Sequence, residues 1–470
     1  MRRAAPILAL SLALATPAFA VQKPTTLPDA ALAQAAQLRE TALADDTGWK
    51  VVESLTTEVG PRMGGSEADA RAVAWAQAKF KELGFDKVWT EPVTFPKWER
   101  RSERGEVLGA HAQPLHLTAL GGSPGGTVEG EVVRFDGLQA LLDAPADSLK
   151  GKIAFVDFVM RPKRDGADYG IGSRVRYLGP GEAGKRGAVG YVMRSAGTDS
   201  HRVPHTGGTG FKPGDAAIPS AALSVPDAQQ LSRLVALGTT KIRLALDCGY
   251  NGEYTSQNVI GEIAGSRKPE EIVLIGGHLD SWDLGTGAID DAAGIGISMA
   301  AAKLIKPLKP ARTIRVVAFA NEEQGLFGGI EYAKRHAAEL KQHVLVAESD
   351  SGAGHIYGFN GGNIGDHAKD AFAGIGAALA PLGVEMLPNE GEPESDTSPI
   401  AGMGAAWAWL GHDGTRYFDL HHTADDTLDK IDPKELAQNV AAYAVYAWLV
   451  SQAEGDFGSD PAKAKPPQEF

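Results

Sequence analysis

The segment IVLIGGHLDSWDLGTGAIDDAAG, residues 272–294, decides the fold that we predict for this chain. Its first part, Ile272–Ile275, is wholly apolar, as expected for a strand of a parallel sheet that is covered on both faces. His278 and Asp280 follow, and both side chains can reach one point because residues i and i+2 of an extended chain point the same way. Asp290 then begins a predicted helix. The segment therefore predicts a strand–loop–helix unit with polar side chains at the carboxyl end of its strand.

The same alternation of strand and helix continues towards the end of the chain. Periodicity predicts further strands at 313–318, 343–347 and 405–410, and helices over 290–305, 324–340, 366–382 and 433–454. Helices over 29–59 and 66–83 and a strand at 86–93 precede them. Such alternation is typical of α/β proteins. We predict a doubly wound, mostly parallel sheet with helices on both faces, whose functional residues lie outside the carboxyl ends of the strands.

The sequence changes character between residues 119 and 250. Gly-rich turns separate short β-rich runs there, which predicts a mostly β inserted domain at 119–250. The α/β domain is then discontinuous and consists of residues 21–118 and 251–455. The Pro- and Lys-rich residues 456–470 predict a disordered tail.

Residues 1–20 have the pattern of a secretory signal peptide. Arg2 and Arg3 precede a short apolar stretch, Ile7–Ala15, and Ala18–Ala20 fits the small-x-small cleavage rule. We therefore predict export to the periplasm or to the outside of the cell. No later segment approaches the roughly 18 apolar residues of a spanning helix, so no membrane anchor is expected.

Composition narrows the classes of partner and of metal site. The chain has 470 residues, with 46 Lys and Arg against 59 Asp and Glu, and its formal charge is −13. A nucleic-acid binder would concentrate basic residues to neutralise phosphates, so no nucleic-acid partner is expected. Cys248 is the only cysteine, which excludes an intrachain disulfide and every zinc site built from several cysteines.

Histidine or acidic residues follow every strand that we predict in the second half of the chain. Beyond those already named, they are Glu322, Glu323, Glu348, Asp350, His421 and His422. Each alone has an ordinary explanation as a helix cap, a turn residue or a surface residue. Together, however, five or more carboxylates at one sheet edge would repel each other strongly. Either a cation is bound among them or their pKa values rise.

Imidazole and carboxylate ligands without sulfur suit zinc or a similar divalent ion. Two histidines and three or more carboxylates exceed the three protein ligands of one tetrahedral catalytic zinc. They fit two ions roughly 3.5–4 Å apart that share a carboxylate and a water, so we predict two Zn²⁺ per chain. One of the adjacent Glu322 and Glu323 can then bind metal, while the other takes a proton from the activated water.

Four motifs, in this order along the chain, resemble metallopeptidase family 28, the co-catalytic di-zinc exopeptidases. They are GGHLDSWDLGTGAIDDAAG at 276–294, NEEQG at 321–325, ESDSG at 348–352 and HTADDT at 422–427. The resemblance also implies a cis peptide bond after Asp290. Residues 119–250 resemble a protease-associated domain, which we expect to shape substrate access or to mediate a homodimer.

The resemblance implies a role for each motif residue. It implies five metal ligands: His278 and Asp350 on one zinc, Glu323 and His422 on the other, and Asp290 bridging both. Glu322 would be the general base, and Asp280 would orient His278 through its other ring nitrogen. His421 is the alternative to His422 as a ligand.

The implied function is a secreted di-zinc exopeptidase that hydrolyses terminal bonds of peptides or dipeptides with metal-activated water. HLDSWD at 278–283 and YFDLHH at 417–422 most resemble a carboxypeptidase branch of the family. Carboxypeptidase or dipeptidase action is therefore expected, and aminopeptidase action is the alternative. Substrate contacts are expected from Arg416, as a cation for a terminal carboxylate, and from Tyr417, Ser395 and Asp396.

Two other motifs suggest rival functions. GPGEAGK at 179–185 is close to a phosphate-binding loop, but Arg186 stands where magnesium binding needs Ser or Thr. GGSPG at 121–125 fits the elbow of a serine hydrolase, but Pro124 has no N–H for the oxyanion hole. A serine hydrolase and a non-catalytic metal-bearing binding protein are the remote alternatives.

Overall fold

The computed structural model describes residues 23–212, 214–388 and 391–465, so the predicted signal peptide lies outside the described residues. The strands pair into one 14-stranded sheet. They are β1 (Lys87–Leu108), β2 (Gln113–Leu115), β3 (Leu117–Ala119), β4 (Gly126–Phe135), β5 (Ile153–Val156), β6 (Gly190–Arg194), β7 (Ser220–Leu223), β8 (Lys241–Ile263), β9 (Lys268–His278), β10 (Arg312–Phe319), β11 (His343–Glu348), β12 (Ile356–Gly362), β13 (Glu385–Met386) and β14 (Trp407–His412).

Eleven α-helices accompany these strands in the described part of the chain. They are α1 (Asp29–Leu43), α2 (Thr47–Glu58), α3 (Glu67–Glu82), α4 (Leu138–Leu142), α5 (Tyr169–Lys185), α6 (Val225–Leu237), α7 (Ala293–Ile305), α8 (Phe327–Arg335), α9 (Lys369–Leu379), α10 (Ser398–Gly402) and α11 (Pro433–Gln452). Among the residues that the structure describes, none of these helices combines the length and the apolarity needed to span a bilayer.

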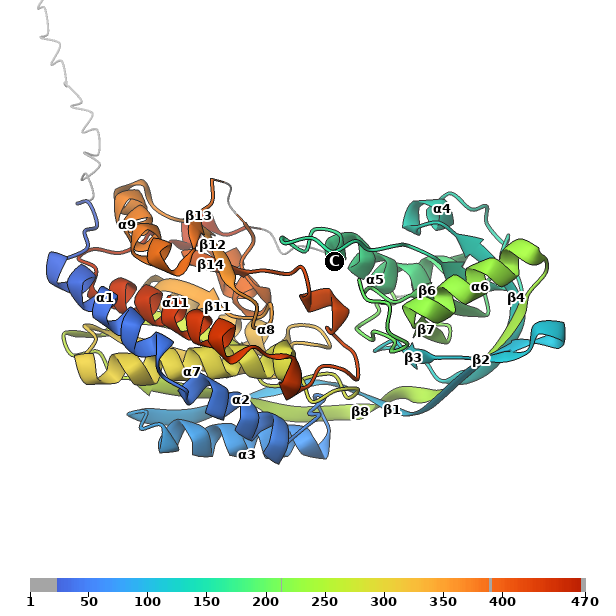
Figure 1. The fold of residues 1–470 in the computed structure, drawn as a ribbon, viewed down its shortest axis with the longest axis horizontal. Helices are drawn as coiled ribbons and strands as arrows, with labels where there is room; N and C mark the ends of the chain where they lie inside the picture. Colours follow the sequence, from blue (N-terminus) through green and yellow to red (C-terminus); the bar gives the residue numbers. More distant parts are fainter. Residues whose placement is uncertain (1–22, 213, 389–390, 466–470) are drawn as a thin grey trace, which may run out of the picture.

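The first lobe, on the left of Figure 1, contains four neighbouring parallel strands in the order β14-β11-β9-β10. Every residue of β10 and β11 is buried, as expected for strands that are covered on both faces. Side chains of α1, α2, α7, α9 and α11 pack against one face, and side chains of α8 and α10 pack against the other. This arrangement confirms the predicted doubly wound α/β fold.

Two long antiparallel strands, β1 and β8, connect the first lobe to a second one (Figure 1). Their pairing runs from Lys87 opposite Glu262 to Leu108 opposite Lys241. Near one end β8 also pairs with β10, and near the other end it pairs with β4. The two-stranded ribbon therefore joins the sheet of one lobe to the sheet of the other.

The second lobe has its own parallel strands, β4-β5-β6-β7, with helices α4, α5 and α6 around them (Figure 1). This lobe is more helical than the sequence predicts. The reason is α5, whose 17 residues include Pro180 and several glycines, a composition that normally disfavours a helix. Packing of its buried face against the strands overrides that local preference.

The predicted helix start at Asp290 is wrong, because α7 begins only at Ala293. Asp290 and Asp291 have non-helical φ angles of −136° and −134°. The peptide bond between them is cis, as the family resemblance implies. Asp290 therefore lies in the turn before the helix.

The predicted disordered tail is wrong for residues 456–465, while 466–470 lie outside the described residues. The Phe457 side chain is fully buried in the main core of the first lobe. The Ser459 hydroxyl donates a hydrogen bond to the carbonyl of His343 at 2.5 Å, which ties the tail to the start of β11. A buried aromatic side chain and hydrogen bonds to the first lobe thus anchor a segment whose composition predicts disorder.

The loop between β9 and α7 is held by the buried guanidinium of Arg62, which lies in the turn between α2 and α3. Arg62 donates to the carbonyls of Leu279 at 2.6 Å, Thr286 at 2.7 Å and Gly287 at 2.9 Å. The Asp426 carboxylate holds the end of the same loop by accepting from the N–H groups of residues 288 and 289, both at 2.7 Å. The path of this loop therefore depends on two buried charged side chains.

Replacing Arg62 is expected to destabilise the protein strongly. Arg62→Met leaves three buried carbonyls without their charged donor, so we expect a loss of about 3–5 kcal/mol in the free energy of unfolding. Urea unfolding of the variant measures this as a lower midpoint. Arg104→Met is the matched control, because the Arg104 side chain is 76 % exposed. Equal midpoints for the two variants would contradict the role given to Arg62.

Candidate metal centre

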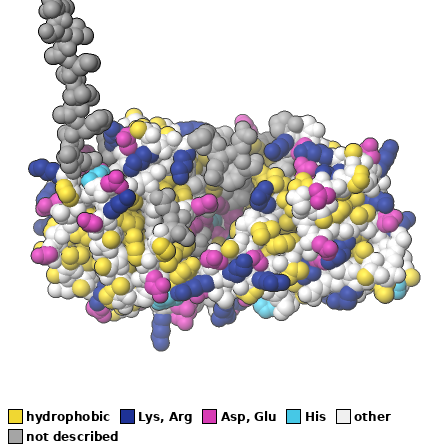
Figure 2. Space-filling view, turned by 90° about the horizontal axis from the view of Figure 1, so that it is seen from above, with side chains coloured by type: hydrophobic (Ala, Val, Ile, Leu, Met, Phe, Trp, Pro, Cys, Tyr) yellow, Lys and Arg dark blue, Asp and Glu magenta, His cyan; other side chains and the backbone are white. Residues whose placement is uncertain are grey.

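Residues that follow four neighbouring strands meet at one edge of the sheet in the first lobe. His278 ends β9, Glu322 and Glu323 follow β10, Asp350 follows β11 and His422 lies in the loop after β14. Asp290 comes from the turn before α7. A hollow with acidic side chains is visible near the middle of the molecular face in Figure 2. The carboxyl ends of the parallel strands thus bring together residues that are far apart in the sequence.

Asp290, His278 and Asp350 lie close together and form the first group of candidate ligands. His278 Nε2 lies 2.9 Å from Asp290 Oδ1 and 3.2 Å from Asp350 Oδ1. Two ligands of one tetrahedral zinc with bonds of about 2.0 Å are roughly 3.3 Å apart, so these separations suit a shared ion. The His278 ring is almost completely buried, which keeps water away from this group.

Asp290, Glu323 and His422 form the second group. His422 Nε2 lies 3.2 Å from Asp290 Oδ2 and 3.0 Å from Glu323 Oε2. The two oxygens of Asp290 therefore face two different histidines. Within the described residues, Asp290 Oδ2 and Glu323 Oε1 are buried without any hydrogen-bond partner. Buried oxygens of this kind are normally satisfied, so the two groups fit a pair of divalent cations bridged by Asp290.

His421 lies beside His422 but has fewer contacts with the acidic groups. The two rings stack with their centroids 3.5 Å apart, and His421 Nε2 is 3.5 Å from Asp290 Oδ2. His422 contacts both Asp290 and Glu323, whereas the ion pairs of His421 in the described residues include only Asp290. The geometry therefore favours His422 as the ligand and leaves His421 as its neighbour.

Asp280 links the two halves of the centre. Its carboxylate accepts hydrogen bonds from the backbone N–H groups of Glu322 at 3.0 Å and Glu323 at 3.4 Å. Its Oδ1 atom also lies 3.5 Å from His278 Nδ1, and its carbonyl oxygen lies 3.2 Å from the same nitrogen. Because Nδ1 faces these acceptors, the lone pair of Nε2 is directed towards the side of Asp290 and Asp350, where a metal ion could bind.

Glu322 is only half-buried and is not part of either group of close ion pairs. Desolvation by burial and then the negative charge of Asp350 raise the pKa of Glu322 well above its ordinary value. A bound cation would oppose this effect, because positive charge favours the ionised carboxylate. The charge of the acidic centre thus affects the pKa of Glu322, although Glu322 belongs to neither group of candidate ligands.

The four residues predicted to contact substrate have different surroundings. Ser395 donates a hydrogen bond to Asp350 Oδ2. Tyr417 is half-buried, with its ring 5.0 Å from the ring of His421. Asp396 is buried and accepts from the Gly329 N–H at 2.6 Å, so it braces α8. Arg416 is exposed, and its side chain forms no ion pair or hydrogen bond with the residues that the structure describes.

Sequence reasoning assigned no role to several residues that support the centre. Arg62 and Asp426 hold the loop that bears Asp290, and Glu348 Oε2 accepts from the Thr397 N–H at 2.9 Å beside Ser395. Asp426 belongs to the HTADDT motif, so that motif could have singled it out. Nothing in the local sequence distinguishes Arg62 from a surface arginine.

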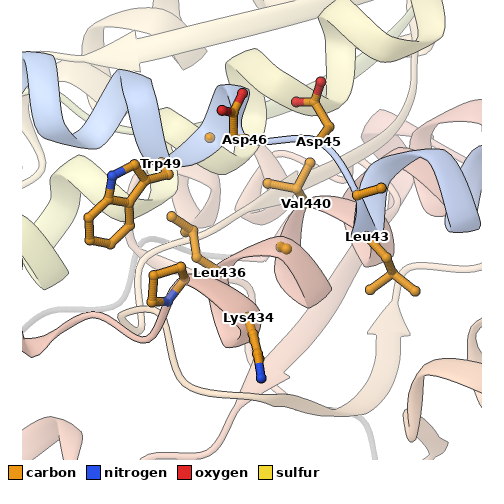
Figure 3. A pocket seen from close by; sticks show the side chains of 11 residues that line it. Leu43, Asp45, Asp46, Trp49, Lys434, Leu436 and Val440 are labelled. Atoms are coloured by element: carbon orange, nitrogen blue, oxygen red, sulfur yellow. The ribbon is translucent and has the colours of Figure 1, made fainter.

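The motifs of the rival functions have structural roles instead. Ser123 is fully buried, and its hydroxyl accepts from the Ser220 N–H at 2.9 Å and donates to the Pro124 carbonyl at 3.0 Å. GPGEAGK at 179–185 lies inside α5, so it does not form a phosphate-binding loop before a helix. A cavity of about 270 Å³ lies between α2 and α11, beside Trp49 and Leu436, and none of the metal-centre residues lines it (Figure 3).

The chain is similar to known peptidases over most of its length. The model of peptidase family M28 matches residues 258–447. Human carboxypeptidase Q is 33 % identical over 87 % of this chain and 86 % of that protein. Aminopeptidase YwaD of Bacillus subtilis is 23 % identical over 87 % of this chain and 86 % of that protein.

Solved structures agree with this assignment. The crystal structure of a peptidase M28 precursor from Shewanella amazonensis SB2B is 47 % identical, with a TM-score of 0.88 over 94 % of this chain and all of that chain. A zinc aminopeptidase from Bacillus subtilis shares the fold, with a TM-score of 0.63 at 21 % identity over 85 % of this chain and 94 % of that chain. The chain therefore belongs to peptidase family M28, and it is a metallopeptidase.

Proposed function

We propose that the chain is an exported di-zinc exopeptidase that removes terminal residues from peptides or splits dipeptides. The observation that carries this proposal is the position of Asp290, whose two carboxylate oxygens face His278 and His422 at 2.9 Å and 3.2 Å. A single carboxylate between two separate histidine–carboxylate groups is the arrangement that two neighbouring cations require. The zinc aminopeptidase of the same fold supports zinc as the metal.

The proposed ligands are His278 and Asp350 for one ion, Glu323 and His422 for the other, and Asp290 for both. When bound, a zinc pair would acidify a shared water and polarise the carbonyl of the scissile bond. Glu322 would accept the proton of the attacking water on its carboxylate and pass it to the leaving amine. Asp280 would keep Glu322 and Glu323 in register by binding both of their backbone N–H groups. Tyr417 and Ser395 would lie beside the substrate.

Carboxypeptidase or dipeptidase action is the favoured direction. Its support is the similarity to carboxypeptidase Q along nearly the whole chain, 33 % in the human protein and 35 % in the mouse protein. Aminopeptidase action is the alternative, because the aminopeptidase of Bacillus subtilis is also similar, at a lower identity of 23 %. Residues 119–250 are proposed as the insert that limits access to the centre or pairs two copies, and residues 1–20 are proposed as the export signal.

The role of Glu322 can be separated from metal binding. Glu322→Gln removes the proton acceptor but none of the proposed ligands, so kcat should fall roughly 10²–10⁴-fold while bound zinc is unchanged. Asp290→Ala should instead lower the zinc content, because both ions lose a ligand. Zinc is counted by elemental mass spectrometry, and kcat is measured on a peptide library. Glu82→Gln on the exposed end of α3 is the matched control. Wild-type kcat for Glu322→Gln would refute the assignment.

Peptides that are blocked at one end test the direction of cleavage. We expect N-acetylated peptides to be shortened from the carboxyl end, C-amidated peptides to resist, and free dipeptides to be split. Mass spectrometry of the digests records which residues are released. A zinc chelator should abolish every cleavage, and added zinc should restore it. The reverse pattern would support an aminopeptidase, and chelator-resistant cleavage that a serine reagent stops would support a serine hydrolase.

A further inference from the structure

Residues 195–206 of the second lobe, which we call the clamp segment, bind the loop that bears His421 and His422, and Tyr169 of α5 also contacts this loop, with its ring 4.9 Å from the ring of His421. Thr198 N–H donates to the Phe418 carbonyl at 3.0 Å, and the Thr198 hydroxyl donates to Asp419 Oδ1 at 2.7 Å. Further along, Thr206 N–H donates to the His422 carbonyl at 3.0 Å. These bonds tie a loop of the first lobe to the second lobe at both of its ends.

The clamp segment also reaches the ring of His422. Its Nδ1 atom lies 3.2 Å from the Thr206 carbonyl oxygen, which can only accept a hydrogen bond. His422 Nδ1 must therefore carry the proton, and Nε2 is left with its lone pair towards Asp290 and Glu323. The backbone of His422 has a φ of +62°, in the left-handed region that few residues other than glycine adopt. Ring and backbone of this residue are thus both held by Thr206.

A buried ion pair between His205 and Asp199 supports the contact between Thr206 and His422. His205 Nδ1 lies 2.7 Å from the His421 carbonyl oxygen, and His205 Nε2 lies 2.6 Å from Asp199 Oδ2. Both partners are acceptors, so the ring donates from both nitrogens. The His205 and Asp199 side chains are each only 1 % exposed. His205 is fixed in turn by its N–H, which donates to the Ser195 hydroxyl at 2.8 Å.

We propose that His205, together with Asp199, is a positioning residue for the metal ion that His422 binds. It acts through the main chain, because its Nδ1–H holds the carbonyl of His421 while the next residue, Thr206, holds His422. The inserted lobe thereby completes a metal site whose ligands all come from the other lobe. This inference rests on the proposed di-zinc function, since it requires a second ion at His422.

Gly197 offers an independent way to disturb the same ring. A Cβ atom at this position would lie 2.3 Å from His205 Cε1 and from His205 Nε2, so Gly197→Ala must displace the imidazole without changing its chemistry. His205→Leu removes both donors and keeps a side chain of similar size. Arg202→Gln is the matched control, because Arg202 lies in the clamp segment but pairs with Asp227 on α6 at 2.7 Å.

The test measures zinc retained by the full-length holoenzyme during dialysis against zinc-buffered solutions. We expect the wild type and Arg202→Gln each to bind two zinc ions, with the same affinities in the two proteins. In His205→Leu and Gly197→Ala, the affinity for one ion should fall about 10–100-fold while the other ion is unchanged. Excess zinc should then restore kcat with KM unaltered, which a purely structural defect would not allow.

The possible results separate the role of His205 from the di-zinc function on which that role rests. Two ions held by either variant as tightly as by Arg202→Gln would overturn the role of His205 and leave the di-zinc function standing. Fewer than two ions in the wild type would overturn both. If His205→Leu does not fold, Gly197→Ala decides alone, since it keeps every hydrogen-bonding group of the pair.

Discussion

The buried carboxylate of Asp290, placed between the rings of His278 and His422, is the contact on which the rest of the structure depends. A charge at this depth is stable only with opposite charge or donors around it. The two histidines come from the end of β9 and from the loop after β14, so one carboxylate connects opposite sides of the sheet edge.

Most of the hydrogen bonds that hold the surroundings of Asp290 are made to backbone groups. Arg62 donates to three carbonyls, Asp426 and Asp280 each accept from two N–H groups, and the clamp segment holds His421 and His422 through main-chain atoms. Because these charged groups bind the main chain, they fix the backbone positions of the candidate ligands in addition to the contacts among the ligands' own side chains. Such fixed placement of ligands is what a metal site needs for precise geometry.

The four parallel strands at the centre could be predicted because strands buried on both faces are continuous apolar runs. The cluster of His, Asp and Glu could be predicted because several carboxylates at one sheet edge repel one another unless a cation is bound among them. Other features have no local pattern. β12 is rich in glycine and follows no alternation, and α5 contains residues that disfavour helices. Arg62 and His205 act on carbonyls that are 217 and 216 residues away, so only the folded chain identifies them.

The ribbon of β1 and β8 carries the chain into the second lobe and out of it again through adjacent strands. The connectivity alone would allow a short turn between the two strands to replace this lobe, with the path of the remaining chain unchanged. The hydrogen bonds to the main chain of His421 and His422 nevertheless make this lobe part of the support of the metal centre that we propose. Substitutions on the outer surface of the lobe are therefore expected to leave the metal centre unchanged, while loss or exchange of the whole lobe would have to be accompanied by a new way of holding His422.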